Sequence, residues 1–122
     1  MLQTSTQTHD PLAGRPDAAA LRAIVAAVVG AAHPLTIVLF GSRARGDHRP
    51  TSDADLLVIV PEGVTTRAVC AALDAHLALA DAPLDIDVIA ATPARLAAAR
   101  GDYSSVLHWA QEEGLTLYDA RG

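Results

Sequence analysis

The sequence predicts an α/β fold in which a small mixed β-sheet is flanked by helices. Short runs rich in Val, Ile and Leu alternate along the chain with longer segments whose apolar residues recur at helical spacing. Ala, Leu and Val dominate a hydrophobic content of 51%, which favours helices packed closely on a small sheet over an aromatic-lined cavity. The 122 residues suit one domain with a single core.

The N-terminal region divides into a lead-in and a first helix. Residues 1–16 are polar and carry prolines and a glycine without periodicity, so we expect a flexible lead-in followed by a single domain over residues 17–122. Asp17 can cap a helix that continues to about His33, since apolar residues form a stripe along it. Pro34 would end that helix.

The remainder of the chain contains strand-like runs separated by further helices. The segments expected to form strands are residues 35–40, 54–60, 84–90 and 115–118. A second helix should begin at Thr65 or Thr66 and end near Asp81. Thr92 is expected to cap a short helix with Pro93 at its first position, an arrangement that helices prefer.

The C-terminal part should consist of one more helix and the last small strand. Apolar spacing predicts the helix over residues 103–113, and Gly114 would end it. We expect Trp109 and Tyr118 to pack this helix and strand against the domain.

A Gly-Ser pair followed after ten residues by Asp-x-Asp is the most informative pattern in the chain. Gly41 and Ser42 end the first apolar strand, and Asp53 and Asp55 begin the second. Because residues i and i+2 of a strand point to the same face, the two carboxylates should project together. Aligned carboxylates opposite a turn with free backbone amides favour a divalent metal and a polyphosphate.

This pattern resembles the signature of the polymerase-beta-type nucleotidyltransferases. The run GSRARGD, from Gly41 to Asp47, is most similar to their smallest members, the minimal nucleotidyltransferases. The resemblance covers roughly residues 35–119. It implies a polymerase-beta-like nucleotidyltransferase fold, transfer of a nucleoside monophosphate from ATP as substrate, and Mg²⁺ as cofactor, with two ions expected.

The resemblance also implies a third carboxylate on a neighbouring strand, where it can activate the acceptor hydroxyl. Asp85 and Asp87 are the two candidates, and alternation places both on one face. Asp87 directly precedes an apolar run, as in the family pattern, and is preferred. Asp53, Asp55 and Asp87 are therefore the candidate catalytic residues and the candidate metal ligands, since Mg²⁺ prefers oxygen.

Four residues of the turn are the candidates for nucleotide binding. Gly41 would let the backbone approach phosphate closely. Ser42 offers a hydroxyl and an amide at the start of a short helix that could face the anion. The guanidinium groups of Arg43 and Arg45 could bind the triphosphate, although pairing with a surface acid such as Asp47 is an equally good interpretation of either one.

Charge and composition narrow the class of partner. A formal net charge of −5 without any lysine argues against direct binding of nucleic acid, whereas arginines beside the motif suit a small polyanion such as a nucleoside triphosphate. No apolar run approaches the ~20 residues that span a bilayer, so no membrane association is expected. The absence of a secretion signal and the single cysteine, Cys70, indicate the cytoplasm.

The size of the chain bears on its acceptor, because larger transferases of this type recognise the acceptor with a second domain. The resemblance therefore implies a partner protein. In that family it is often a HEPN-domain ribonuclease toxin, and the transferase is its antitoxin and adds AMP to a toxin tyrosine. Two alternatives stay open: a small-molecule acceptor such as an aminoglycoside, for which a homodimer could build the site, and a non-catalytic antitoxin that neutralises its partner by occlusion.

Overall fold

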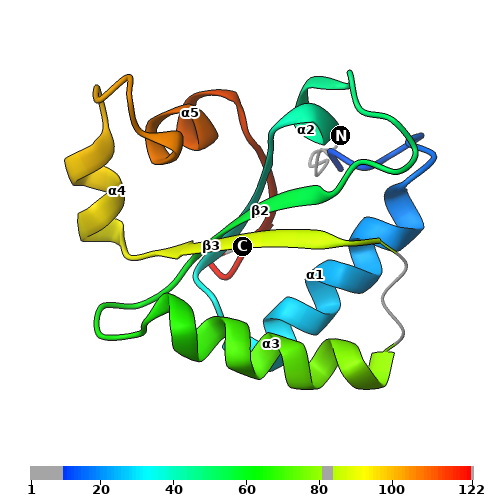
Figure 1. Ribbon diagram of the computed structural model, residues 1–122, viewed down its shortest axis with the longest axis horizontal. Helices are drawn as coiled ribbons and strands as arrows, with labels where there is room; N and C mark the ends of the chain where they lie inside the picture. The colour runs from blue at the N-terminus through cyan, green and yellow to red at the C-terminus, as the bar shows by residue number, and fades with distance from the viewer. Residues whose placement is uncertain (1–9, 81–83, 122) are drawn as a thin grey trace, which may run out of the picture.

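A four-stranded mixed sheet is the centre of the computed structural model, which describes residues 10–80 and 84–121 (Figure 1). The strands are β1 (Thr36–Phe40), β2 (Ala54–Ile59), β3 (Ile86–Ala91) and β4 (Leu115–Asp119). Their order in the sheet is β3-β2-β1-β4. β1 is antiparallel to both of its neighbours, whereas β2 and β3 are parallel. The predicted α/β class with a small mixed sheet is confirmed.

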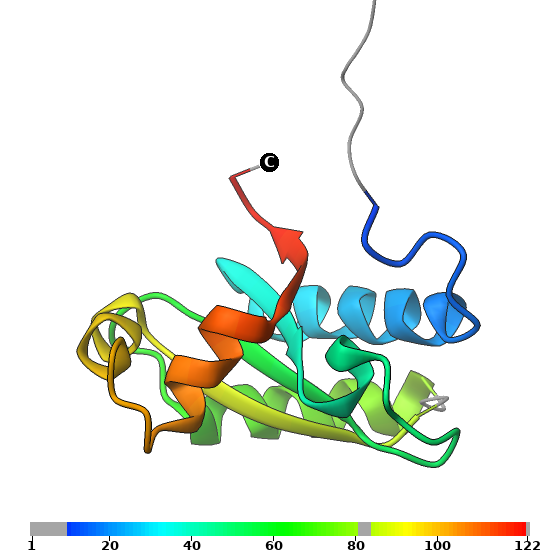
Figure 2. The same cartoon turned by 90° about the horizontal axis from the view of Figure 1, so that it is seen from above.

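Five helices flank this sheet in the described part of the chain. They are α1 (Ala18–Ala32), α2 (Ser42–Arg45), α3 (Thr66–Ala80), α4 (Pro93–Ala99) and α5 (Val106–Glu113). In Figure 1, α1 and α3 lie below the sheet and α5 lies above it. Figure 2 shows α5 across the strands, between α4 and β4.

Alternation along β2 divides the buried residues into two cores. Leu56 and Val58 pack with the apolar side of α1 and α3. Leu57 points the other way and packs with Leu96 of α4 and Leu107 of α5. Since side chains alternate along a strand, Asp55 shares the face of Leu57, on the α4 and α5 side of the sheet.

The predicted strands and helices all occur, with ends within three residues of those expected. Thr92 caps α4 as predicted: its hydroxyl accepts a hydrogen bond from the Arg95 amide, and Pro93 is the first helical residue. α5 begins later than predicted because Ser105 caps it, after a turn in which Asp102 accepts hydrogen bonds from Ser104.

Two predictions about individual side chains near the helices are wrong. Asp17 precedes α1 but makes no side-chain capping hydrogen bond, because its carboxylate is paired with arginines. Trp109 does not pack α5 against the domain; Leu107 and Ala110 occupy the buried side of this helix instead. Tyr118, by contrast, is partly buried against the core below the sheet.

The predicted lead-in over residues 1–16 falls partly outside the described residues. Residues 10–16 form turns, and Leu12 is buried in the core that contains α1. The Leu12 amide donates to the Asp10 carboxylate, which helps to hold this turn. This part of the segment thus adds an apolar residue to the core. No helix within the described ranges has both the length and the apolar character that crossing a membrane requires.

Candidate active site

The carboxylates predicted to be catalytic lie at the starts of two neighbouring strands. Asp53 directly precedes β2, Asp55 is the second residue of β2, and Asp87 is the second residue of β3. In the parallel pairing of these strands, Asp55 lies opposite Asp87. The structure therefore brings the three predicted acids to one end of the sheet, on the face that α4 and α5 cover further along.

The three acids influence one another electrostatically. Burial raises the pKa of Asp55 above its ordinary value, and the negative charges of Asp87 and Asp53 raise this pKa further. The positive charge of Arg45 acts in the opposite direction. The site is thus a region of concentrated negative charge in which a bound cation would relieve the repulsion.

This donor set fits a divalent cation in its chemistry, because Mg²⁺ is bound by carboxylate oxygens. Asp55 offers a partly desolvated carboxylate, and the neighbouring acids Asp87 and Asp53 raise its pKa. Within residues 10–80 and 84–121, however, no three His, Cys, Asp or Glu side chains are already grouped closely enough to hold a metal ion. Mg²⁺ is usually held by one or two carboxylates together with substrate phosphates and waters, so these acids would share the ion with a triphosphate.

Gly41 has a backbone conformation that suits glycine alone, with φ of 74° and ψ of −153°. A Cβ at this position would collide with Oδ2 of Asp55. Asp55 is held next to the turn because it pairs with Phe40, the residue before Gly41, across β1 and β2. Gly41 was predicted to let phosphate approach the backbone closely. The structure adds a second reason for glycine here, which is to leave room for the Asp55 carboxylate.

The short helix predicted after the Gly-Ser turn is α2, with Gly41 at its N-cap position. The first amides of a helix lack intrahelical partners, so Ser42 and Arg43 begin α2 with backbone donors for an anion. α2 packs against β1 and β2. This arrangement keeps Ser42 as a candidate for phosphate binding beside the carboxylates.

Arg43 requires a correction, because the protein's own acceptors occupy its guanidinium group. The side chain is only 2% exposed, and its Nη1 lies 2.9 Å from Asp17 Oδ2. Nε and Nη2 donate to the Ser52 carbonyl at 3.0 and 2.8 Å, and Nη2 also approaches the Pro50 carbonyl at 3.2 Å. Arg43 therefore fixes the loop between α2 and β2 and is not free to bind a triphosphate.

Asp17 and Arg15 complete this buried cluster. Two hydrogen bonds from Arg15, at 2.8 and 2.9 Å, are the main reason that the pKa of Asp17 falls from 3.8 to about 2; burial opposes the change, and Arg43 adds to it. Arg15 also donates to the Arg43 carbonyl at 2.9 Å. The turn that precedes α1 is in this way tied to α2.

Arg45 remains a candidate for binding a triphosphate. Its side chain is half exposed and pairs with Asp47 at 3.2 Å. Its charge reaches Asp55, so the guanidinium group lies near the carboxylates. Exposed ion pairs of this kind contribute little free energy, so a phosphate could replace Asp47 as the partner of Arg45 at small cost.

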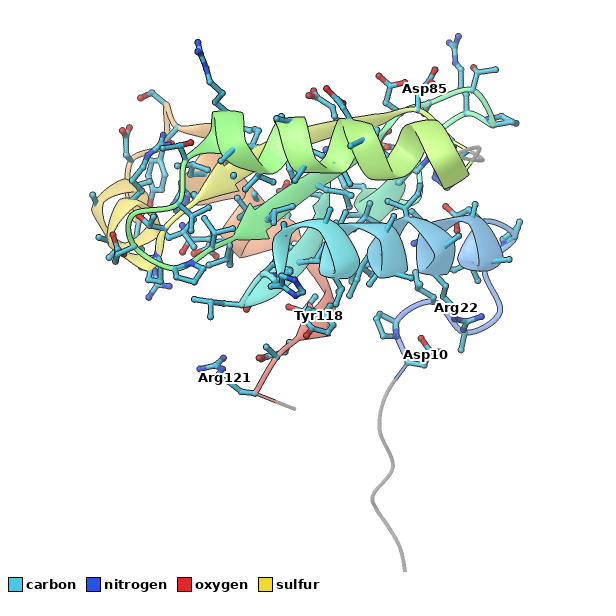
Figure 3. All side chains as sticks on the ribbon, turned by 90° about the horizontal axis from the view of Figure 1, so that it is seen from below. Asp10, Arg22, Asp85, Tyr118 and Arg121 are labelled. Carbon is cyan, nitrogen blue, oxygen red and sulfur yellow. The ribbon has the colours of Figure 1, made fainter. Side chains whose placement is uncertain are left out.

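Asp85 lies just before β3, at the edge of the sheet (Figure 3). Asp85 is exposed, as is Asp87, and the Asp85 backbone carbonyl accepts a hydrogen bond from the Ala54 amide at 2.9 Å. Asp87 is the residue opposite Asp55 and one of the charges that act on it. These observations favour Asp87 over Asp85 as the third carboxylate.

We expect Asp87→Asn to lower turnover at saturating ATP by about 10²–10⁴-fold, the usual contribution of a general base. Asp85→Asn should change turnover by less than about threefold, because only the Asp85 backbone makes a contact that holds the sheet. The two variants form a matched pair, to be compared by initial rates with labelled ATP. Loss of activity in Asp85→Asn with normal activity in Asp87→Asn would reverse the assignment.

Comparisons with known proteins agree with this fold. A family model described as a nucleotidyltransferase domain matches residues 21–113. No curated protein sequence matches the chain. A chain in a crystal structure of a toxin–antitoxin with AMP-PNP superposes with a TM-score of 0.55 at 17% identity, over 82% of this chain and 73% of that one.

A proposed nucleotidyltransferase from Sulfolobus solfataricus has a similar fold, with a TM-score of 0.58 and 16% identity over 97% of this chain and 95% of that one. At such low identity, both likenesses concern the fold. The family model supplies the identification, since it spans β1, β2, β3 and the Gly-Ser turn together with all three acids. The chain belongs to the family of proteins with a nucleotidyltransferase domain.

Proposed function

We propose that this nucleotidyltransferase is an antitoxin that transfers AMP from ATP to a tyrosine hydroxyl of a HEPN ribonuclease toxin. The observation that carries the proposal is the pairing of Asp55 with Asp87 beside Asp53 and the Gly41 turn. The toxin–antitoxin with AMP-PNP, whose chain has a similar fold, supports ATP as the nucleotide and a toxin as the partner.

The chain's own residues would divide the work of the reaction. Three acids would hold Mg²⁺, namely Asp53, Asp55 and Asp87. The bound ion would neutralise the negative charge that develops on the phosphates. Ser42, the amides that begin α2 and Arg45 would hold the triphosphate. Asp55 keeps its place because Gly41 leaves the space for it.

Asp87 would act on the acceptor. Its carboxylate would take the proton of the tyrosine hydroxyl as that oxygen attacks the α-phosphorus of ATP. The bond between the α-phosphorus and the oxygen that bridges to the β-phosphorus breaks, and pyrophosphate leaves on the opposite side. The products are a tyrosine esterified with AMP, free pyrophosphate and the proton on Asp87, which passes to solvent, so atoms and charges balance.

The toxin is expected to be encoded by the gene next to that of this protein. The test is to incubate the purified protein with ATP, Mg²⁺ and the purified product of that adjacent gene, and then to measure the intact mass of that product. We expect its mass to rise by one AMP group, on a tyrosine, and its ribonuclease activity to fall. Asp55→Asn is the matched control, because it retains the fold and the surface but lacks one metal ligand.

Three results would contradict this proposal in different ways. Full neutralisation without a change of mass would indicate occlusion. Efficient transfer of AMP to an aminoglycoside, and none to the protein, would indicate a small-molecule acceptor. Modification of the protein on a residue other than tyrosine would retain the reaction class but overturn the acceptor group.

A further inference from the structure

An aromatic patch on and beside α5 is the largest concentration of exposed apolar side chains in the described part of the chain. Five large hydrophobic residues are exposed in the described part of the chain, and three of them lie within seven positions of the sequence. These are Tyr103, Val106 and Trp109, which are 72%, 49% and 44% exposed. We call these three residues the aromatic patch. Exposed apolar groups clustered in this way mark interaction sites more often than isolated ones do.

The two rings of the aromatic patch are held in place by the protein itself. Trp109 Nε1 donates to the Tyr103 carbonyl at 2.9 Å, and the Tyr103 and Trp109 rings lie 5.7 Å apart. Both rings also contact His108, with centroid distances of 4.9 and 4.8 Å. His108 is buried, and its Nδ1 accepts a hydrogen bond from the Gly101 amide.

Because these contacts already restrict the rings, a partner that covers them would lose little side-chain entropy on binding. Trp and Tyr are also the residues that most often dominate the binding energy of protein interfaces. The aromatic patch thus has the composition and the preorganisation of an interface centre.

Acidic residues predominate around the aromatic patch, although Arg100, which donates a hydrogen bond to Gln111 of α5, adds one positive charge. Residues 101–120 contain four acids and neither Lys nor Arg. Asp102, Glu112 and Glu113 among them are exposed and lie next to or within α5. We call these three residues the acidic rim. An apolar centre with a charged rim is the usual layout of a protein interface, and a negative rim selects a positive partner.

The aromatic patch belongs to the same side of the molecule as the three carboxylates. Leu107 of α5 packs in the same core as Leu57 and Ile89. Two positions before those residues in their strands are Asp55 and Asp87, on the same face of the sheet. A protein seated on α5 would therefore lie on the face from which an acceptor group must approach the carboxylates.

We propose that the aromatic patch and the acidic rim form the docking surface for the acceptor protein, and that this partner has an apolar centre surrounded by Lys and Arg. The inference rests on the proposed function for the identity of the acceptor. It adds the surface that binds this acceptor and the chemistry that such a surface selects. Acidic carboxylates on the same face extend the negative potential that would attract a basic protein.

The experiment measures binding separately from transfer, by calorimetric titration of the purified product of the adjacent gene without ATP. Val106→Arg puts a bulky cation into the aromatic patch and should weaken binding at least about tenfold, as loss of a central contact does. Val64→Arg is the matched control, since Val64 is 37% exposed at a site outside the patch and just before a helix. It should bind like the wild type.

A second variant tests the charge. Glu112→Lys with Glu113→Lys should slow association and weaken its dependence on salt, while leaving the melting temperature unchanged. Melting temperatures of all variants establish that they are folded. Sedimentation of the protein alone shows whether the patch instead joins two copies of this chain.

Several outcomes would overturn the docking surface. Binding of the partner by Val106→Arg with wild-type affinity would be one such outcome. An equal loss of affinity in Val106→Arg and Val64→Arg would be another. A dimer that Val106→Arg dissociates, with unchanged binding of the partner, would assign the patch to self-association. No binding by the wild type would reject the partner and the surface together. Binding that depends on the patch without any transfer of AMP would instead uphold the surface and reject the proposed reaction.

Discussion

Asp53→Asn and Asp55→Asn should each reduce nucleotidyl transfer by at least about a hundredfold and leave the protein folded. An amide cannot supply the anionic oxygen that Mg²⁺ requires, and loss of one group that stabilises developing charge costs on the order of 10²–10³-fold in rate. Asp55 already carries a raised pKa through burial and the charges of Asp87 and Asp53. Removal of one negative charge from this group should therefore not lower stability.

The measurement is the rate of label transfer from ATP in the presence of Mg²⁺, together with the melting temperature of each variant. Asp119→Asn is a suitable control, because it removes a carboxylate from β4, the edge strand at the other side of the sheet from β3. Its activity should equal that of the wild type. Undiminished transfer by Asp53→Asn or Asp55→Asn would show that the reacting groups lie elsewhere.

Arg43→Met should lower the free energy of unfolding by about 3 kcal/mol, at the lower end of the range for breaking a buried ion pair. The substitution removes the donors of the Ser52 and Pro50 carbonyls and leaves Asp17, which is 9% exposed, with Arg15 as its remaining arginine partner. We expect a loss at the lower end of this range because Arg15 still compensates the charge of Asp17 in the variant.

Arg49→Met is the matched control for this prediction, since Arg49 is an exposed arginine of the same loop. Its effect on unfolding in urea should stay within about 0.5 kcal/mol. A nucleotide-binding role for Arg43 predicts the opposite pair of results, namely unchanged stability and a higher KM for ATP. That result would restore the interpretation that the structure overturns.

The stability lost in Arg43→Met should depend on pH in a defined direction. Because the pKa of Asp17 is lowered from 3.8 to about 2 in the folded protein, its ionised form stabilises the fold at pH values above about 4. This contribution disappears as the pH falls from about 4 to about 2. Arg15 is the larger cause of this shift and remains in Arg43→Met, so the difference between wild type and variant should shrink over the same interval only by the part that Arg43 contributes.

The fold was predictable to the extent that it depends on local pattern. Runs of β-branched and leucine residues indicated the strands, and the Thr92–Pro93 pair indicated the start of α4. The nearness of Asp53 to Asp55 was expected from their spacing, and the charge of Asp53 does raise the pKa of Asp55, although Asp53 itself lies just before β2. The opposition of Asp55 and Asp87 depends on the pairing of two strands, which alternation alone does not determine.

Interactions between distant parts of the chain are the part that the sequence did not reveal. Arg43 was assigned to phosphate because it stands in the motif, whereas its acidic partner Asp17 lies 26 residues earlier. Trp109 was expected to pack against the domain. This prediction failed because helical spacing does not tell which of two partly apolar sides of a helix the sheet will cover. In the structure, Leu107 and Ala110 are covered and Trp109 is exposed.

The parallel register of β2 and β3 ties the chemistry of the site to the core. A slip of β3 by one residue would place Ile86 or Val88 opposite Asp55 and would turn Asp87 toward the apolar residues under α3. A carboxylate buried there would be strongly unfavourable. The residues that penalise such a slip, Leu56 and Val88 among them, belong to the core beside α1 and α3, yet they keep the two acids side by side. Misalignment of the reactive groups is therefore opposed by hydrophobic packing rather than by any bond between the acids themselves.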